Sequence, residues 1–210
     1  IRTDSSITNS ATGRLVAGGA VGMTIGQSDN SFTSAGLLEA RTGSSMTVSA
    51  DTADVDGTVG GGGTITTNPA MTGEMTLAPG DLANSDGTGD STIGTLTIDG
   101  NMTLEGDSVV EIQLDDGVGD MLVLINGGLI TDNTDSLTLA LTGTHSENPI
   151  LSLDSSQDGL AFDTILYNGT DVTSTGFSPQ SLGGLYQLEW DGGGNLLFVH
   201  EPASGLLLGL

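Results

Sequence analysis

The most constraining feature of the sequence is the stretch 93–114, where apolar side chains alternate with Thr, Asp or Glu. Leu96 and Ile98 alternate with threonines, and the alternation resumes after two turn signals, Asp99-Gly100 and Glu105-Gly106-Asp107. Period-2 alternation that is interrupted by glycine-containing turns is typical of short β-strands with one buried face. The stretch therefore predicts short strands that are joined by tight turns.

The same type of segment recurs along the chain, and no segment shows a 3.6-residue period. Met121–Ile125 is continuously apolar, which predicts a strand buried on both faces or a poorly registered one. Trp190 to Leu196 encloses three glycines and reads as a hairpin, Pro79-Gly80 is a strong turn, and 60–63 is interpreted as a flexible linker or a tight corner. Further strands are expected at 14–17, 21–25, 36–40, 45–48, 64–66, 74–77, 129–130, 137–141, 150–153, 162–167, 185–190 and 196–199.

These segments predict an all-β fold, either a β-solenoid (β-helix-like) or an elongated β-sandwich of short strands with Gly-rich turns. The 210 residues are 36% hydrophobic but only 3% aromatic, so the core must consist of aliphatic side chains and Met. Such a core suits a thin stack of strands. We divide the chain into an N-terminal strand segment at 1–50, which is interpreted as an inter-subunit docking arm, a main β domain at 51–200, and an apolar tail at 201–210.

The formal charge of −24 narrows the choice of partners. There is no Lys, and Arg2, Arg14 and Arg41 are the only arginines. Nucleic-acid binding requires Lys and Arg facing phosphates, so nucleic acid is not expected as a partner. Anionic membrane surfaces attract basic segments and are disfavoured for the same reason. No run of about 20 apolar residues is present that would predict a transmembrane segment.

Catalytic chemistry has little support in the sequence. A nucleophile–base arrangement needs an imidazole or an equivalent base, and only His145 and His200 are available, neither within a motif. Paired carboxylates of a polysaccharide-degrading enzyme are an alternative, because there are 27 acidic residues. Such sites usually have aromatic platforms, which this chain lacks. We therefore predict a non-enzymatic protein without catalytic or cofactor-binding residues.

Calcium is the most plausible ligand, because hard divalent cations prefer oxygen-rich loops. The segment Asp54-Val55-Asp56-Gly57 resembles part of an EF-hand loop but lacks its final Glu. Diffuse screening of the acidic surface by cations is the simpler reading, so no dedicated metal site is predicted. The acidic loops that are candidates for Ca²⁺ contain Asp81, Asn84, Asp86 and Asp90, and Asp115, Asp116 and Asp120.

Residues from about Thr64 to Val199 resemble the autotransporter-associated β-strand repeat proteins. The resemblance rests on four segments: MTLAPGD at 75–81, GTLTIDGNMTL at 94–104, FDTIL at 162–166 and YQLEWDGG at 186–193. The sequence departs from the family pattern by an Asp-rich insert between Pro79-Gly80 and Gly94. The resemblance implies a secreted, passenger-like β-solenoid of bacterial origin.

The tail EPASGLLLGL at 201–210 is similar to the start of a PEP-CTERM sorting signal, although His200 stands where that signal has Pro. This similarity implies export, with assembly at a cell surface rich in exopolysaccharide. The alternative is an ordinary apolar last strand. A start at Ile1 rather than Met also agrees with removal of a leader.

We thus expect a secreted, extracellular structural protein of the cell surface or matrix, which self-assembles as a homo-oligomer or polymer, a filament or a layer. Edge strands without Lys favour strand addition. The alternative is a carbohydrate-binding or adhesive module with exopolysaccharide as its partner.

Overall fold

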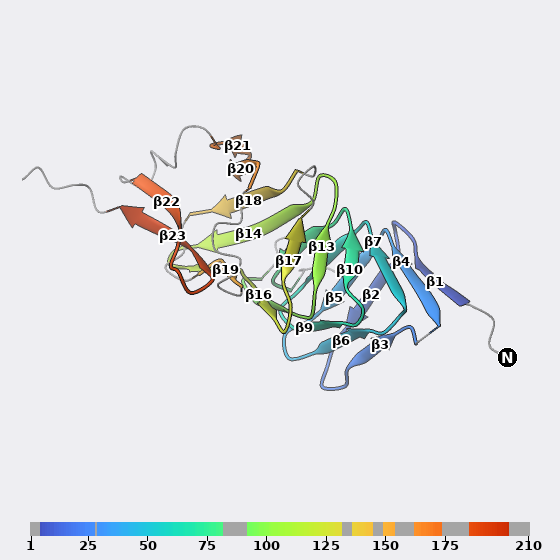
Figure 1. Ribbon diagram of the computed structural model, residues 1–210. Helices are drawn as coiled ribbons and strands as arrows, with labels where there is room; N and C mark the ends of the chain where they lie inside the picture. The colour runs from blue at the N-terminus through green and yellow to red at the C-terminus, as the bar shows by residue number, and fades with distance from the viewer. Residues whose placement is uncertain are drawn as a thin grey trace, which may run out of the picture.

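The computed structural model describes residues 5–27, 29–81, 92–131, 136–144, 149–153, 162–173 and 185–201. Within these ranges the chain forms strands and turns and contains no helix, which confirms the all-β class (Figure 1). No described residue belongs to a helix of the length and apolarity that crossing a membrane requires.

The strands form three sheets, here called A, B and C. Sheet A contains, in spatial order, β1 (Ser5–Asn9), β4 (Asn30–Ser34), β7 (Thr52–Val55), β10 (Met71–Gly73), β13 (Met102–Leu104) and β17 (Leu129–Thr131). Sheet B contains β2 (Arg14–Ala17), β5 (Leu37–Ala40), β8 (Thr58–Gly61), β11 (Thr76–Pro79), β14 (Val109–Asp115), β18 (Thr138–Gly143), β20 (Thr164–Tyr167) and β21 (Thr170–Asp171), with β15 (Val118–Gly119) against β14. Sheet C contains β3 (Met23–Ile25), β6 (Ser45–Val48), β9 (Thr64–Thr67), β12 (Thr95–Asp99), β16 (Met121–Ile125), β19 (Leu151–Ser152), β23 (Asn195–Glu201) and β22 (Leu185–Trp190).

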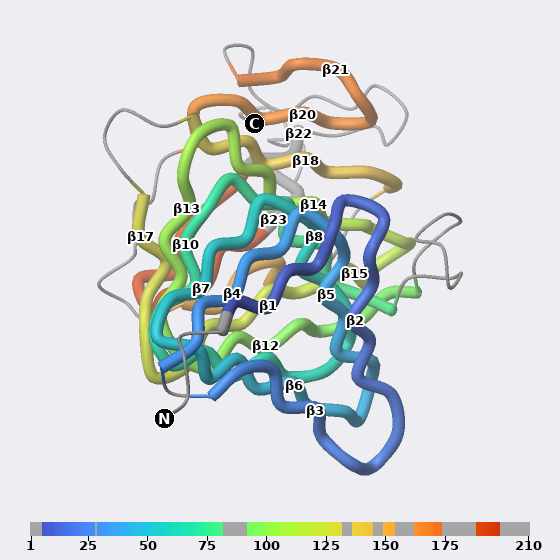
Figure 2. The backbone as a smooth tube through the Cα atoms, turned by 90° about the vertical axis from the view of Figure 1, so that its right-hand side faces the viewer, coloured from blue at the N-terminus to red at the C-terminus, as the bar shows by residue number. Residues whose placement is uncertain are grey.

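The strand order identifies a solenoid rather than a sandwich. Apart from β15 and the two C-terminal hairpins, consecutive strands enter different sheets, and each pairs in parallel with its equivalent one coil away, as β5 does with β2 and β8. Each coil therefore adds one strand to every sheet. The molecule has a three-sided cross-section, which is visible in Figure 2, where the view runs roughly along the solenoid axis. The tight turns predicted from the sequence are the corners between sheets.

The core consists of ladders of inward-facing apolar side chains that repeat from coil to coil. In sheet A, Phe32 lies over Ala53, which lies over Met71 and then Met102. All four are almost completely buried. Parallel strands lie about 4.8 Å apart, so each side chain contacts its equivalent above and below. The period-2 pattern thus produces a narrow interior that is mostly aliphatic, as the composition predicted, although the aromatic Phe32 is also part of it.

Glycine is required at corners where coils approach closely. A Cβ atom on Gly57 would collide with the carbonyl oxygen of Gly36, one coil below, and Gly61 combines a φ of 110° with a similar collision at Ala40. Gly60 and Gly61 end strand β8 and are buried, and Gly62 and Gly63 form the next corner. The 60–63 segment is therefore a strand end and a tight corner, and the linker alternative is wrong.

The end of the solenoid that is formed by the C-terminal strands differs from its other end. Strands β20 and β21 form an antiparallel hairpin on sheet B, and β22 and β23 form another on sheet C. The predicted Trp190–Leu196 hairpin is confirmed, with Asp191 Oδ1 accepting hydrogen bonds from the N–H groups of Gly193 (2.7 Å) and Asn195 (3.1 Å) in its loop. Among the described strands, sheet A ends earlier, at β17.

Both predictions for Met121–Ile125 are wrong. Strand β16 buries only Leu122 and Leu124, whereas Ile125 is 42% exposed. All five residues pair in register with β12. The strand is apolar on both faces, but only the face of Leu122 and Leu124 is fully buried, since the residues of the other face are partly or largely exposed.

Residues 5–50 supply the first coils of the same three sheets that hold the main domain. Of the predicted tail, only Glu201 lies among the described residues, at the end of β23.

Candidate interaction surface

The acidic loops, which were the candidates for Ca²⁺, use their central carboxylates to fix corners. Oδ1 of Asp81 accepts hydrogen bonds from the N–H groups of Thr42 and Gly62, both at 2.9 Å. Asp81 therefore joins neighbouring corners between sheets B and C. Asn84, Asp86 and Asp90 lie outside the described residues.

Asp120 has the same role, in a more buried position. Its side chain is 1% exposed, Oδ1 accepts a hydrogen bond from Gly94 N–H (2.8 Å), and Oδ2 accepts one from Gln113 N–H (3.0 Å). Burial raises the pKa of the Asp120 carboxyl to about 6, although both backbone hydrogen bonds lower it. Asp120 thus tethers β14 to the corner before β12.

The other predicted ligands do not converge. Asp115 ends β14, and Asp116 lies in the exposed turn to β15 with a φ of 26°. Asp54 points outward on β7, and Oδ1 of Asp56 accepts a hydrogen bond from Glu74 N–H (3.1 Å). Among the described residues, no three or more His, Cys, Asp or Glu side chains are grouped so that they could hold a metal ion.

The two histidines do not form a site within the described part of the chain. His145 lies outside it, and His200 lies on β23 opposite Tyr186 of β22. Of His200 only the backbone is described.

A groove of about 910 Å³ follows the corner between sheets A and B across several coils. Its floor consists of small residues, among them Gly13, Gly36 and Gly57. Arg14 lies on β2 in the first coil, whereas the groove's carboxylates, Asp56, Glu74, Asp107 and Glu111, belong to later coils. The groove is a polar surface without aromatic side chains.

The N-terminal end of the solenoid combines three features of an interaction surface. The first is its open sheet edges. Within the described residues β1, β2 and β3 each have a neighbouring strand on one side only, so all three sheets end in the same coil (Figure 2). A strand with one neighbour directs half of its backbone hydrogen-bonding groups away from the sheet.

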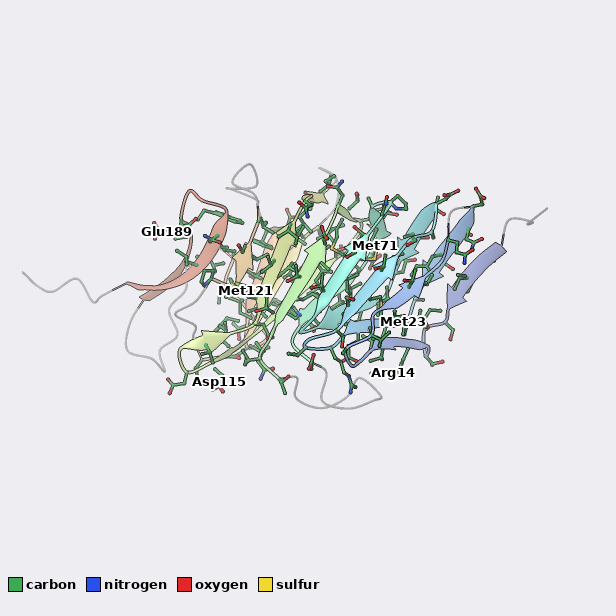
Figure 3. All side chains as sticks on the ribbon, turned by 90° about the horizontal axis from the view of Figure 1, so that it is seen from below. Arg14, Met23, Met71, Asp115, Met121 and Glu189 are labelled. Atoms are coloured by element: carbon green, nitrogen blue, oxygen red, sulfur yellow. The ribbon has the colours of Figure 1, made fainter. Side chains whose placement is uncertain are left out.

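The second feature is an exposed end of the core. Ile7, Leu15 and Met23 begin the inward ladders but are only partly buried. Their equivalents one coil further, Phe32, Leu38 and Met46, are completely buried. Val21, between β2 and β3, is 84% exposed. Apolar surface therefore lies at this end of the molecule, which Met23 marks in Figure 3.

The third feature is the absence of negative charge. The sequence contains no acidic residue between Asp4 and Asp29, and Arg14 is the only charged residue of residues 5–27. Arg14 is itself paired with buried Glu39 of β5, at 3.7 Å between Nη2 and Oε2. In a chain with a net charge of −24, the first coil is free of carboxylates.

Sequence reasoning identified Lys-free edges and interpreted residues 1–50 as a docking arm, but it did not show that Ile7, Leu15 and Met23 lie together at one end. The acid-free stretch was visible in the sequence, yet its meaning depends on the topology, which places residues 5–27 in one terminal coil. Comparisons with protein-family models, with curated proteins and with solved structures found no match, so the resemblances described above stay predictions.

Proposed function

We propose that this chain is a non-enzymatic, extracellular structural protein of the cell surface or matrix, which assembles into a fibre or layer through strand addition. The observation that carries the proposal is the coincidence of three open sheet edges, β1, β2 and β3, in one coil. Open edges of terminal strands template pairing with a further chain, and terminal repeats of a solenoid need a polar outer face to stay soluble as monomers.

The partly exposed Ile7, Leu15 and Met23 support the same proposal, because apolar side chains at a sheet end favour burial against a partner. The resemblance to secreted β-strand repeat proteins and to a sorting signal supports a location outside the cell. The acidic outer surface limits contact between the sides of two solenoids, since like charges repel.

Electron micrographs of the purified chain test this proposal. We expect polymers or layers, and we expect deletion of residues 1–10, which removes β1, to abolish them. Deletion of residues 203–210 tests the tail in the same way. A protein that stays monomeric at high concentration, or polymers that survive both deletions, would refute the proposal.

The second candidate function is carbohydrate binding, which the groove between sheets A and B favours. Its length across several coils and its polar rim of Arg14 and carboxylates fit an extended, hydroxyl-rich chain such as an exopolysaccharide. Binding of the monomer to a glycan array, and its loss in Thr12→Trp, which places a bulky side chain at an exposed position of the groove lining, test this candidate. An intact array signal in a folded Thr12→Trp variant would exclude the groove.

A further inference from the structure

We infer that two copies of this chain join end to end through their first coils, about a two-fold axis perpendicular to the solenoid axis. In this contact β1 of one copy pairs antiparallel with β1 of the second copy. The inference rests on the proposed function, because it specifies one contact of the assembly. An isologous contact alone closes at a dimer, so a fibre or layer requires a second contact between such dimers.

The backbone of the first coil is set up for such pairing. The carbonyl groups of Asn9, Gly13 and Ile25 accept hydrogen bonds from N–H groups of Ala35, Leu37 and Ser49 in the second coil. Backbone groups of successive residues in a strand point to alternate sides. Thr8 on β1 and Thr24 on β3 therefore direct their N–H and C=O groups toward the open end.

The two-fold arrangement satisfies all three edges at once. An axis through the middle of β1 brings β1 against its equivalent and exchanges sheets B and C. Strand β2, with four residues, then faces β3 of the second copy, with three. Isologous contacts of this kind are the usual solution in homodimers, and antiparallel pairs are slightly more stable than parallel ones.

The opposite end of the same solenoid does not fit the first coil. Within the described part of the chain, sheet A stops at β17 whereas sheets B and C continue into antiparallel hairpins, so the described strands do not present three edges of one coil there. The hairpins also carry exposed Asp171 and Glu189. Packing these carboxylates against Ile7, Leu15 and Met23 would remove charge from water without a partner.

The first coil of a second copy would not bring carboxylates against these apolar side chains. Its residues 5–27 contribute no carboxylate, and its partly exposed Ile7, Leu15 and Met23 would continue each inward ladder across the interface. The two cores would then form one continuous apolar interior.

Single-cysteine cross-linking tests the contact, since the chain has no native Cys. Ser6→Cys and Thr8→Cys each place a thiol on β1, and a short bismaleimide should link each variant to a second copy of itself. Thr52→Cys, which is exposed on β7 of the same sheet, is the matched control and should not cross-link. In a head-to-tail polymer, equivalent thiols would lie roughly 30 Å apart, given about 4.8 Å per coil, which is beyond the reach of the linker.

Sedimentation equilibrium of Thr8→Pro provides the second measurement. Proline removes the Thr8 N–H, which faces the open end, and proline is tolerated on edge strands. We expect the dissociation constant to rise at least tenfold. Thr8→Val is the control, because it removes only the hydroxyl, which accepts a hydrogen bond from Thr33 Oγ1 at 3.3 Å, and it should associate like the parent.

The outcomes separate this inference from the proposed function. Cross-linked dimers of the Ser6→Cys or Thr8→Cys variant without polymers support the contact and refute the fibre or layer. Polymers without these cross-links support assembly and overturn the two-fold contact, whereas monomers overturn both. If Thr8→Pro does not fold, which circular dichroism would reveal, the cross-linking result alone decides.

Discussion

Arg14 on β2 and Glu39 on β5 form an ion pair between the first and second coils, with 3.7 Å between Nη2 and Oε2. Arg41 Nε donates a hydrogen bond to Oε1 of the same carboxylate at 3.3 Å. Glu39 is completely buried, whereas the Arg14 and Arg41 side chains are 20% and 42% exposed. Two of the three arginines in the chain therefore contact one buried carboxylate. This carboxylate lies in the second coil, next to the first coil through which we expect assembly.

We predict that Glu39→Gln lowers the free energy of unfolding by about 1–3 kcal/mol, because charge-assisted contacts to both arginines are lost. Urea denaturation measures this change. Glu111→Gln is the control, since Glu111 is exposed on β14 of the same sheet and its removal relieves the net charge. A Glu39→Gln variant that is as stable as Glu111→Gln would contradict a stabilising role for the pair.

The close spacing between coils predicts which glycine-to-alanine substitutions at corners lower the stability of the fold. Gly57→Ala should destabilise the fold by about 2–4 kcal/mol, because its Cβ would collide with the carbonyl of Gly36 and the coils would have to separate. Gly18→Ala is the matched control, since its Cβ would have only Arg41 Cδ nearby, at 3.8 Å. This substitution should change the stability by less than about 1 kcal/mol. Thermal unfolding of both variants checks the difference, and equal melting temperatures would argue against close stacking at this corner.

Because the carboxyl group of Asp120 has a raised pKa in the folded chain, the free energy of unfolding should depend on pH. Its pKa of about 6 in the folded chain exceeds the ordinary value of 3.8, so the folded state binds a proton before the unfolded state does. Stability should therefore rise as the pH falls from 7 to 4, by about 3 kcal/mol at most. Above pH 6 the buried carboxylate is ionised and this gain is absent.

Asp120→Asn cannot titrate and isolates that contribution. We expect its unfolding free energy to change less between pH 7 and pH 4 than that of the parent chain, although both respond to protonation of the other carboxylates. Parallel pH profiles for the two proteins would show that Asp120 titrates normally.

Salt should stabilise the solenoid through screening. Asp56, Glu74 and Asp107 line the same groove in successive coils, and like charges at such spacing repel by about 1 kcal/mol or more per pair. Raising NaCl from about 10 mM to about 0.5 M should raise the melting temperature by several degrees. A chelator at constant ionic strength should add no effect, and a marked fall with the chelator would instead indicate a bound divalent cation.

The local structure was largely predictable from the sequence, because it follows from alternation. Leu96 and Ile98 are buried on β12, as their spacing required, and the turns at Gly80 and Gly100 are corners with positive φ. The sequence alone predicts no strand in the segment 51–61, yet this segment forms β7 and β8. Its Gly60 and Gly61 are strand residues here because only glycine allows the neighbouring coil to approach so closely.

The choice between solenoid and sandwich depended on information that alternation does not contain. The register between distant strands decides it, for example Thr58 with Thr76 and Thr76 with Val109, and coils of such unequal length leave no period in the sequence. For the same reason, the sequence did not reveal which residues form the interaction surface. Ile7, Leu15 and Met23 are scattered apolar residues until the topology places them at one end.

Electron cryo-microscopy of the assembled chain tests the central claim most directly, because it reveals which surfaces meet. We predict that neighbouring molecules share one solenoid axis and meet through their first coils, with β1 against β1 across a two-fold axis. Molecules that pack side by side through the outer faces of sheets A, B or C, with their first coils exposed to solvent, would contradict the account.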